Sequence, residues 1–179
     1  MVSLDLIIAA YEPFDDLEAQ HQAAFLHLLR GTVEPYSRNQ FVPGHVTASC
    51  FIIDGLGHLL LHHHRRLNRW LQMGGHLESG EDPGAAALRE GAEESGLTDL
   101  RFVTDEIADL DVHSIPAGRG EPEHRHYDVR YIARTDSADS IAADVRESNQ
   151  LMWFDLDRAA ELMQGEESLR VIQKIRRVL

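Results

Sequence analysis

Residues 75–97 of this 179-residue chain read GHLESGEDPGAAALREGAEESGL. Within this stretch Glu90, Glu93 and Glu94 stand at positions i, i+3 and i+4, which share one face of an α-helix. Neighbouring carboxylates repel one another unless a cation lies among them, and hard divalent cations such as Mg²⁺ prefer oxygen ligands. The spacing therefore predicts a helix whose acidic face binds Mg²⁺.

The ends of this helix can also be predicted. Asp82 is suited to the N-cap and Pro83 to the first helical position, while Gly96 is suited to the end of the helix. The side opposite the carboxylates is expected to face the core through three apolar residues, which are Ala85, Leu88 and Ala92.

Arg89 lies beside the acidic face, within reach of the loop that precedes the helix. A guanidinium can form a bidentate pair with a carboxylate, so we expect Arg89 to bind Glu81 and hold that loop to the helix. Gly74 and Gly75 come just before, where the backbone has to pass close to another group. We expect a loop there, and the Gly75 carbonyl is a further candidate metal ligand.

The stretch resembles the Nudix box, G-x5-E-x7-R-E-U-x-E-E-x-G-U, in which U is an aliphatic residue. The matching residues are Gly75, Glu81, Arg89, Glu90, Glu93, Glu94, Gly96 and Leu97. Gly91 departs from the pattern, because it stands at the first aliphatic position. Glycine inside a helix costs about 1 kcal/mol relative to alanine, and we expect a neighbouring side chain to fill the missing volume.

The resemblance implies an α/β fold, a Nudix α/β/α sandwich with a mixed sheet. It also implies a Mg²⁺-dependent hydrolase, for which Mn²⁺ is an alternative ion, that cleaves a pyrophosphate bond in a nucleoside diphosphate-linked small molecule. The metal ligands would be Glu90, Glu93, Glu94 and the Gly75 carbonyl. The general base would be Glu90 or Glu94, or an acid from a later loop, for which the candidates are Glu147, Glu121 and Glu123.

Histidines form a second unusual feature, since the chain has 11 of them. His124 and His126 would share one face of a strand, where they could hold a metal or contact phosphate. Four residues are candidate substrate contacts, and they are Arg65, Arg66, His76 and His126. We expect Trp70 to pack in the core or in a loop.

The remaining elements follow from periodicity and turn residues. We expect helices over 16–29, 157–163 and 169–179, the last with Leu169, Ile172, Ile175 and Leu179 on one stripe. The expected strands are 46–53, paired as a hairpin with 58–63, and then 100–103, 107–115, 126–133 and 151–154. Residues 1–43 form an N-terminal helical extension and 44–179 the Nudix hydrolase domain. The segment 111–130 is expected to determine specificity.

Composition limits the possible partners. A net charge of −13 without a long basic run argues against binding a nucleic-acid polymer, although bound Mg²⁺ would still allow a small phosphorylated substrate. We see no secretion signal and no membrane-spanning run, and we expect a cytoplasmic enzyme. The single cysteine, Cys50, excludes an internal disulfide. The N-terminal arm either packs on its own domain or takes part in a homodimer.

Two other functions are compatible with this fold. A non-hydrolytic Nudix-fold ligand sensor is one, but sensors of this kind often lose carboxylates of the box, and this chain keeps all of them. An enzyme resembling the isopentenyl diphosphate isomerases is the other. Those enzymes have an altered box and a cysteine in the active loop, whereas Cys50 is expected on an early strand.

Overall fold

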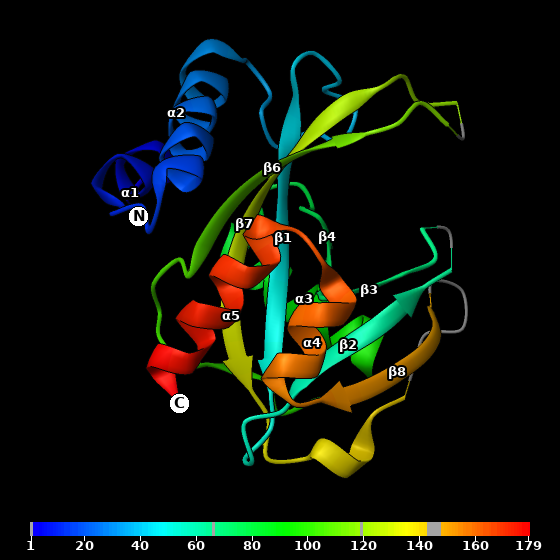
Figure 1. Cartoon of the computed structure of the whole chain (residues 1–179). Coiled ribbons are helices and arrows are strands. Elements are labelled where there is room, and N and C mark those ends of the chain that lie inside the picture. Colours follow the sequence, from blue (N-terminus) through cyan, green and yellow to red (C-terminus); the bar gives the residue numbers. More distant parts are fainter. Residues whose placement is uncertain (1, 66, 119, 143–147) are drawn as a thin grey trace.

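The computed structural model describes residues 2–65, 67–118, 120–142 and 148–179 and has one mixed sheet with helices on both faces (Figure 1). The helices are α1 (Leu4–Ala10), α2 (Asp16–Gly31), α3 (Pro83–Ser95), the 3₁₀ turn η1 (Ala138–Ser140), α4 (Leu156–Met163) and α5 (Glu166–Val178). The strands are β1 (Gly44–Ile53), β2 (Leu59–His64), β3 (Arg69–Leu71), β4 (Met73–His76), β5 (Arg101–Phe102), β6 (Asp109–Ile115), β7 (His124–Arg134) and β8 (Ser148–Phe154). The predicted fold class is confirmed.

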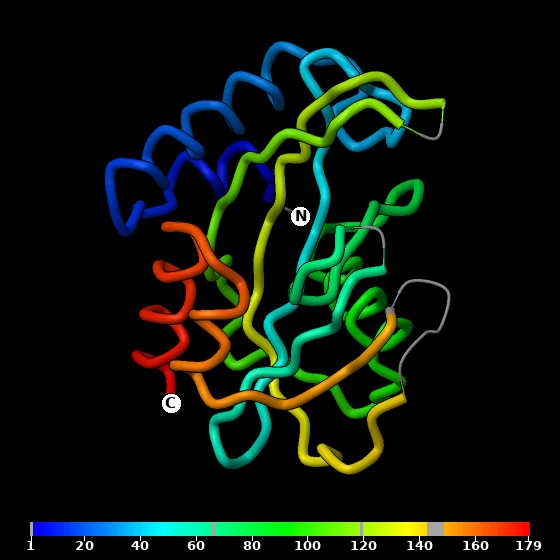
Figure 2. The backbone as a smooth tube through the Cα atoms, turned by 45° about the vertical axis from the view of Figure 1, so that its right-hand side comes forward, coloured from blue at the N-terminus to red at the C-terminus, as the bar shows by residue number. Residues whose placement is uncertain are grey.

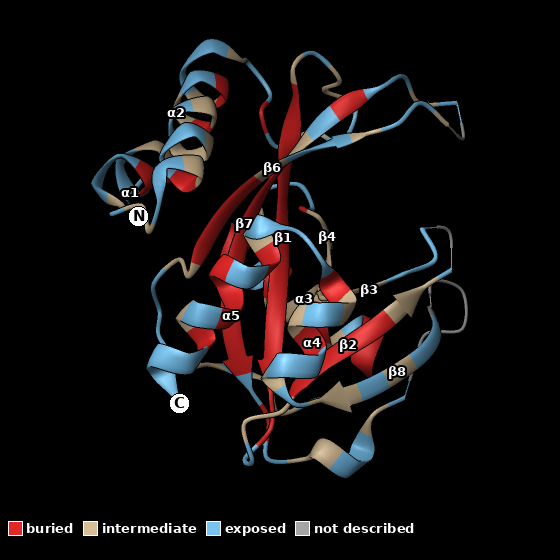
Figure 3. Ribbon diagram, in the orientation of Figure 1, coloured by how far each residue is buried: buried red, intermediate tan, exposed pale blue. Residues whose placement is uncertain are grey.

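Strand β1 is the centre of the sheet. The main order is β3-β2-β1-β7-β5, with β4 beside β1, β6 beside β7 and β8 beside β2. Strand β1 runs parallel to β7 and antiparallel to β4, and all its residues are buried (Figure 3). Its continuous apolar run therefore reflects a strand that is covered on both faces.

On one side of β1 the sheet divides, because β1 pairs with β2 at one end and with β4 farther along. The expected hairpin of β1 and β2 pairs only at Ile53 and Leu59, because β4 takes the place beside residues 47–50 of β1. The loop predicted at Gly74 and Gly75 is wrong, since both residues belong to β4. Glycine is needed here, because a β-carbon on Gly74 would come within 2.6 Å of the Ser49 hydroxyl.

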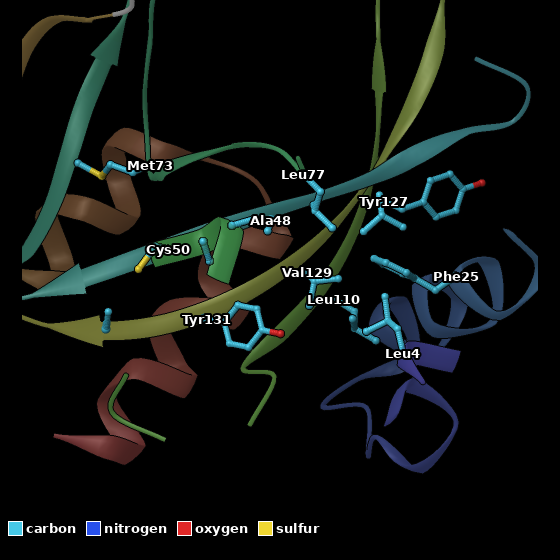
Figure 4. Packing of buried hydrophobic residues seen from close by; sticks show 14 of the residues in the cluster. Leu4, Phe25, Ala48, Cys50, Met73, Leu77, Leu110, Tyr127, Val129 and Tyr131 are labelled. Carbon is cyan, nitrogen blue, oxygen red and sulfur yellow. The ribbon is translucent and has the colours of Figure 1, made fainter. Parts of the chain in front are cut away.

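Alternate residues of β1 face two separate cores. Val46, Ala48, Cys50 and Ile52 pack in a cluster shared with α3 and with the N-terminal helices. Figure 4 shows this cluster, in which Phe25 of α2 meets Tyr127 of β7 edge-on with ring centroids 5.5 Å apart. The N-terminal arm therefore packs on its own domain. The boundary predicted between residues 43 and 44 stays a prediction.

Phe51 and Ile53 point to the opposite face, where they pack against α4 and α5. The expected stripe of α5 is partly wrong, because Leu169 and Leu179 are exposed while Ile172 and Ile175 are buried. The buried face of α5 instead includes Arg170, whose guanidinium binds Asp109 on β6. A charged residue thus lies on the buried face of the helix, which hydrophobic periodicity cannot predict.

Helix α3 has the predicted ends. The Asp82 carboxylate accepts a hydrogen bond from the backbone N–H of Ala85, and Gly96 ends the helix in the left-handed region with φ 74°. Its core face is shifted from the prediction, because Ala86 and Ala87 are buried while Ala85 is exposed. Leu88 and Ala92 are only partly buried.

Gly91 lies on the buried face of α3. A β-carbon there would meet Leu100 at 3.2 Å, Cys50 at 3.4 Å and Ile52 at 3.5 Å. These neighbours occupy the space that a larger side chain would take. The prediction that a neighbour fills this volume is therefore confirmed.

A buried ion network connects the arm to α5. Lys174 of α5 donates to Glu18 of α2 at 2.6 Å and to Asp109 at 2.8 Å, and Tyr11 also donates to Glu18 at 2.6 Å. In both views of the backbone the N-terminal and C-terminal helices are neighbours along one side of the sheet (Figures 1 and 2). None of the described helices combines the length and the apolar character needed to cross a membrane.

Candidate active site

A cleft of about 790 Å³ lies where the sheet opens beside β4. Its walls come from α3, from β1, β2 and β4, and from the β6–β7 hairpin. The lining residues are Arg38, Thr47, Ser49, His62, His64, Leu67, Leu71, Gln72, Gly74, Gly75, His76, Leu77, Glu78, Arg89, Glu90, Glu93, Glu94, His113, Ile115, Pro116, Glu121, His126 and Asp128. All three carboxylates of the predicted acidic face therefore line one cleft.

Two of these carboxylates lie against the backbone of β4. Glu94 accepts a hydrogen bond from the Gly74 N–H at 2.9 Å. Glu90 lies so close to Gly75 that a β-carbon on that residue would come within 2.6 Å of its carboxylate. Glu93 is the outermost of the three, with 59% of its side chain exposed. The absence of a side chain at Gly75 therefore gives Glu90 its position.

Arg89 connects the helix to the loop before it. Its Nε and Nη2 donate to the two carboxylate oxygens of Glu81 at 2.9 Å each, so the bidentate pair predicted from the sequence is present. Nη2 also donates to the His76 carbonyl, and Nη1 donates to Glu90 at 2.8 Å. Because of these hydrogen bonds the pKa of Glu81 is lowered and that of Arg89 is raised.

Strand register brings the histidines together. His45 of β1 pairs with His126 of β7, which pairs in turn with His113 of β6. Residues paired in this way project from the same face of a sheet. The ring centroids of His45 and His126 are 4.8 Å apart, and His76 of β4 lies 5.0 Å from His45. His76, His113 and His126 line the cleft, and His45 of β1 lies beside them.

Burial favours the uncharged form of three of these rings, those of His126, His76 and His45. It lowers the pKa of His126 to about 2, with a further contribution from the neighbouring His113, and lowers that of His76 to about 4. The pKa of His45 is also lowered by burial. At neutral pH these imidazoles therefore act as hydrogen-bonding groups or as metal ligands rather than as cations.

Farther along the same face of the sheet, Thr47, Ser49 and Asp128 line the cleft. Asp128 accepts hydrogen bonds from Thr47 at 3.1 Å, from Ser49 at 2.6 Å and from Arg130 at 2.9 Å. Arg130 also donates to Asp111 at 2.9 Å. These buried hydrogen bonds therefore hold the Asp128 carboxylate in a fixed orientation.

Some of the other predicted site residues line the cleft and others lie outside it. His76, His126 and Glu121 line the cleft, and Glu121 lies 3.5 Å from Arg38. Arg65 and Glu123 are exposed and lie outside the lining set given above. Arg66 and Glu147 lie outside the described residues. Trp70 packs edge-on against Phe154, as expected for a core residue.

Sequence reasoning missed several lining residues. Ser49 and Asp128 alternate with apolar residues on their strands, which is a signal of a polar face within a buried strand. That signal was available in the sequence, but the pairing of β1 with β7 was not. Arg38 lies in a loop without periodicity, so no pattern indicated its place.

The donor set fits Mg²⁺ in its chemistry. The carboxylates of Glu90, Glu93 and Glu94 are oxygen donors in one cleft, and Gly75 leaves room beside them. Mg²⁺ keeps several waters and takes only one or two carboxylates directly, so it does not need a tight cage. Among the residues that the structure describes, the only group with three ligand atoms within 4.8 Å of one another is His45, His124 and His126.

Known proteins resemble this chain in sequence and in fold. Residues 43–175 match the model of the NUDIX domain. A curated relative, the m7GpppN-mRNA hydrolase NUDT17 of Xenopus laevis, is 31% identical over 108 residues. That match covers 56% of this chain but only 36% of the relative, so the chain spans about a third of that protein.

Two solved structures have a similar fold. A Nudix-family hydrolase from Clostridium perfringens is 27% identical, with a TM-score of 0.57 over 75% of this chain and 98% of that one. An Ap4A hydrolase from C. elegans is 20% identical, with a TM-score of 0.61 over 74% of this chain and 95% of that one. At this identity the second likeness concerns the fold alone.

Proposed function

The chain belongs to the Nudix family, and on that premise we propose that it is a pyrophosphohydrolase that uses Mg²⁺ to cleave a nucleoside diphosphate-linked small molecule. One observation carries the proposal. Glu90 and Glu94 lie against the backbone of β4 at the wall of an open cleft, and Arg89 holds the adjoining loop in place. This arrangement presents carboxylate oxygens to a substrate without burying them completely.

The residues that would hold the ion are Glu90, Glu93, Glu94 and the Gly75 carbonyl. When bound, Mg²⁺ neutralises phosphate charge and lowers the pKa of an attacking water; Mn²⁺ accepts the same oxygen ligands. Glu90 or Glu94 would take the proton from that water. His76 and His126 would donate hydrogen bonds to phosphate oxygens, and Arg65 and Arg66 remain candidate contacts for a longer substrate.

The name of the Xenopus relative supports this substrate class. That protein is named as a hydrolase of m7GpppN-mRNA. Its substrate contains a chain of phosphates linked to nucleosides. For this chain we propose a small molecule of that kind rather than a nucleic-acid polymer, because the net charge of −13 opposes binding along a phosphate backbone. A cytoplasmic location and a homodimer are further proposals.

A substrate panel tests the proposal. Nucleoside diphosphate sugars, NADH, ADP-ribose, dNTPs and dinucleoside polyphosphates are incubated with the protein and Mg²⁺, and released phosphate or nucleotide is measured. We expect hydrolysis within one of these groups, its loss in EDTA and its recovery with Mg²⁺ or Mn²⁺. Full activity in EDTA would contradict the metal dependence.

Glu94→Gln tests the role of the acidic face. The amide keeps an acceptor for the Gly74 N–H but removes a charge, so we expect a loss on the order of 2.7–4 kcal/mol in transition-state stabilisation with a smaller change in KM. Glu106→Gln, at an exposed position, is the matched control. Full activity in Glu94→Gln would overturn the mechanism and favour a ligand sensor.

The pH–rate profiles of variants identify the general base. A variant that lacks the base loses the acidic limb of the profile, whereas a variant of a solvated acid keeps it. Glu121→Gln and Glu147→Gln are compared with Glu90→Gln. If both loop variants behave as wild type, the base is sought among Glu90, Glu94 and Glu123.

A further inference from the structure

Three histidines converge at the end of the cleft away from the carboxylates. His45 begins β1, and His124 and His126 begin β7. One nitrogen from each ring lies within 4.8 Å of the others. The ring centroids of His45 and His124 are 5.1 Å apart, and those of His124 and His126 are 5.2 Å apart.

A glycine makes this convergence possible. Gly44 has φ 150°, and a β-carbon on it would come within 1.9 Å of the Arg125 carbonyl oxygen. The chain before β1 and the start of β7 can approach so closely only because Gly44 has no side chain. Figure 2 shows the loop before β1 lying beside the β6–β7 hairpin. The histidine residues on either side of this contact, His45 and His124, are thereby brought together.

Backbone carbonyls fix the tautomers of two of the rings. Nδ1 of His45 lies 3.0 Å from the Gln40 carbonyl oxygen, and Nδ1 of His124 lies 2.8 Å from the Pro122 carbonyl oxygen. A carbonyl oxygen only accepts, so each Nδ1 carries the hydrogen. In a neutral ring Nε2 then has a free lone pair, and both rings present that atom as an acceptor or as a ligand.

The Nε2 atom of His45 finds no hydrogen-bond donor among the residues that the structure describes. His45 is 1% exposed, and this Nε2 is buried. A buried acceptor without a donor is costly. Its neighbours are the aromatic ring of Phe41 and other imidazoles. A cation that accepts nitrogen ligands would satisfy this atom.

We propose that His45, His124 and His126 bind a transition-metal cation of the Zn²⁺ class, at a site separate from the Mg²⁺ carboxylates. Imidazole suits Zn²⁺ and its neighbours, whereas Mg²⁺ prefers oxygen. Zn–N bonds of about 2.0–2.1 Å hold tetrahedral ligands roughly 3.4 Å apart, so nitrogens that lie within 4.8 Å of one another have to approach by no more than about 1.4 Å. Backbone carbonyls on Nδ1 are the outer-shell partners that metal-binding histidines usually have.

The site would be structural. Its ligands join the start of β1 to the start of β7, and β7 is half of the hairpin that forms one wall of the cleft. The bound ion would hold that wall to the centre of the sheet. The proposal does not depend on hydrolysis, because binding is measured directly.

Co²⁺ is the probe, because nitrogen ligands in a tetrahedral site give it intense visible absorption. Protein stripped with chelator is titrated with Co²⁺ in excess Mg²⁺, which occupies carboxylate sites but does not compete for imidazole. We expect one Co²⁺ per chain, displaced by one Zn²⁺, and a higher thermal midpoint with Zn²⁺. No Co²⁺ absorption in excess Mg²⁺ would overturn the proposal, whatever the variants do.

Variants assign the ligands. His124→Gln and His126→Gln should weaken Co²⁺ binding by more than the 10- to 100-fold typical of an outer-shell partner, with folding checked by circular dichroism. His27→Gln, an exposed position on α2, and Glu93→Gln, on the acidic face, should both keep the site. Co²⁺ binding that is lost in Glu93→Gln but kept in the histidine variants would place the ion at the carboxylates and refute the proposal.

Discussion

The carboxylate of Glu90 lies against the α-carbon of Gly75, where a β-carbon would approach it to 2.6 Å. Glu90 also accepts a hydrogen bond from Arg89 at 2.8 Å. The carboxylate is therefore held between a guanidinium and a strand that has no side chain at the point of contact. Its position depends on two residues that do not need to touch a substrate.

Gly75→Ala should reduce turnover without unfolding the protein. The new methyl group would displace the end of a flexible side chain rather than the backbone, so we expect kcat to fall while the urea midpoint changes little. Steady-state kinetics and urea unfolding check this. Gly55→Ala, where a β-carbon meets nothing within 4 Å, is the control. Wild-type kcat in Gly75→Ala would mean that the position of Glu90 is unimportant.

Arg89→Lys should impair turnover although the positive charge remains. Lysine lacks the planar fork that binds both oxygens of Glu81, so the loop and Glu90 lose their alignment. A misplacement of about 1 Å can cost 10²-fold in rate, and we expect a kcat loss of about that size. Arg101→Lys, in a surface pair with Asp136, provides the comparison. Equal kcat in the two variants would contradict the positioning role.

Gly91→Leu should destabilise the protein, because Leu100 already fills the space beside it. Overpacking typically costs about 1–3 kcal/mol. Adding Leu100→Ala to Gly91→Leu should recover part of that loss, since the new side chain then has room. Urea unfolding of both single variants and the double variant measures the coupling. Strictly additive effects would show that the two positions do not share one volume.

Arg130→Met should be strongly destabilising. The Arg130 side chain is 7% exposed and pairs with Asp109, Asp111 and Asp128, so its removal leaves buried carboxylates without their cation. Breaking a buried pair costs about 3–5 kcal/mol. In contrast, Arg134→Met, whose side chain is 50% exposed, should cost no more than about 1 kcal/mol. Similar unfolding free energies for the two variants would argue against the network.

His62 should make stability depend on pH. Burial, with repulsion from His64 and His63, lowers its pKa from 6.5 to about 4. The unfolded chain therefore binds a proton more readily between these pH values, so stability is complete above about 6.5 and declines as pH falls toward 4. One pKa unit corresponds to about 1.4 kcal/mol, which sets an upper bound of about 3.5 kcal/mol.

The measurement is urea unfolding at several pH values between 7 and 4.5. His62→Gln cannot take up this proton, so its unfolding free energy should decline less steeply with falling pH than that of the wild type. His27→Gln, at an exposed position, should follow the wild type. Parallel curves for wild type and His62→Gln would contradict a lowered pKa.

Local chemistry made much of this fold predictable. The N-cap at Asp82, the glycine that ends α3 and the pair of Arg89 with Glu81 all depend on residues close in sequence. Six of the eight described strands could be located because apolar residues and turn residues alternate along the chain, whereas β3 and β4 were not predicted. The acidic face was predicted in the same way, since it needs only helical spacing.

Long-range pairing was not predictable. Gly74 and Gly75 looked like a loop, because glycine is typical of turns, but close contact with β1 explains them equally well. The row of His45, His126 and His113 depends on the register of strands whose histidines are up to 81 residues apart in the chain, and a single sequence does not reveal that register. Likewise, Arg170 on the buried face of α5 makes sense only once Asp109 is opposite it.

The contact of Lys174 with Glu18 and Asp109 has a practical consequence for anyone who shortens this protein. Trimming the chain from its beginning would remove Glu18, and trimming it from its end would remove Lys174. Either deletion removes one partner from this buried ion network and leaves the opposite charge with fewer compensating contacts. The two ends therefore have to be kept together, and a smaller version lacking the N-terminal helices would need Lys174 and its neighbours redesigned at the same time.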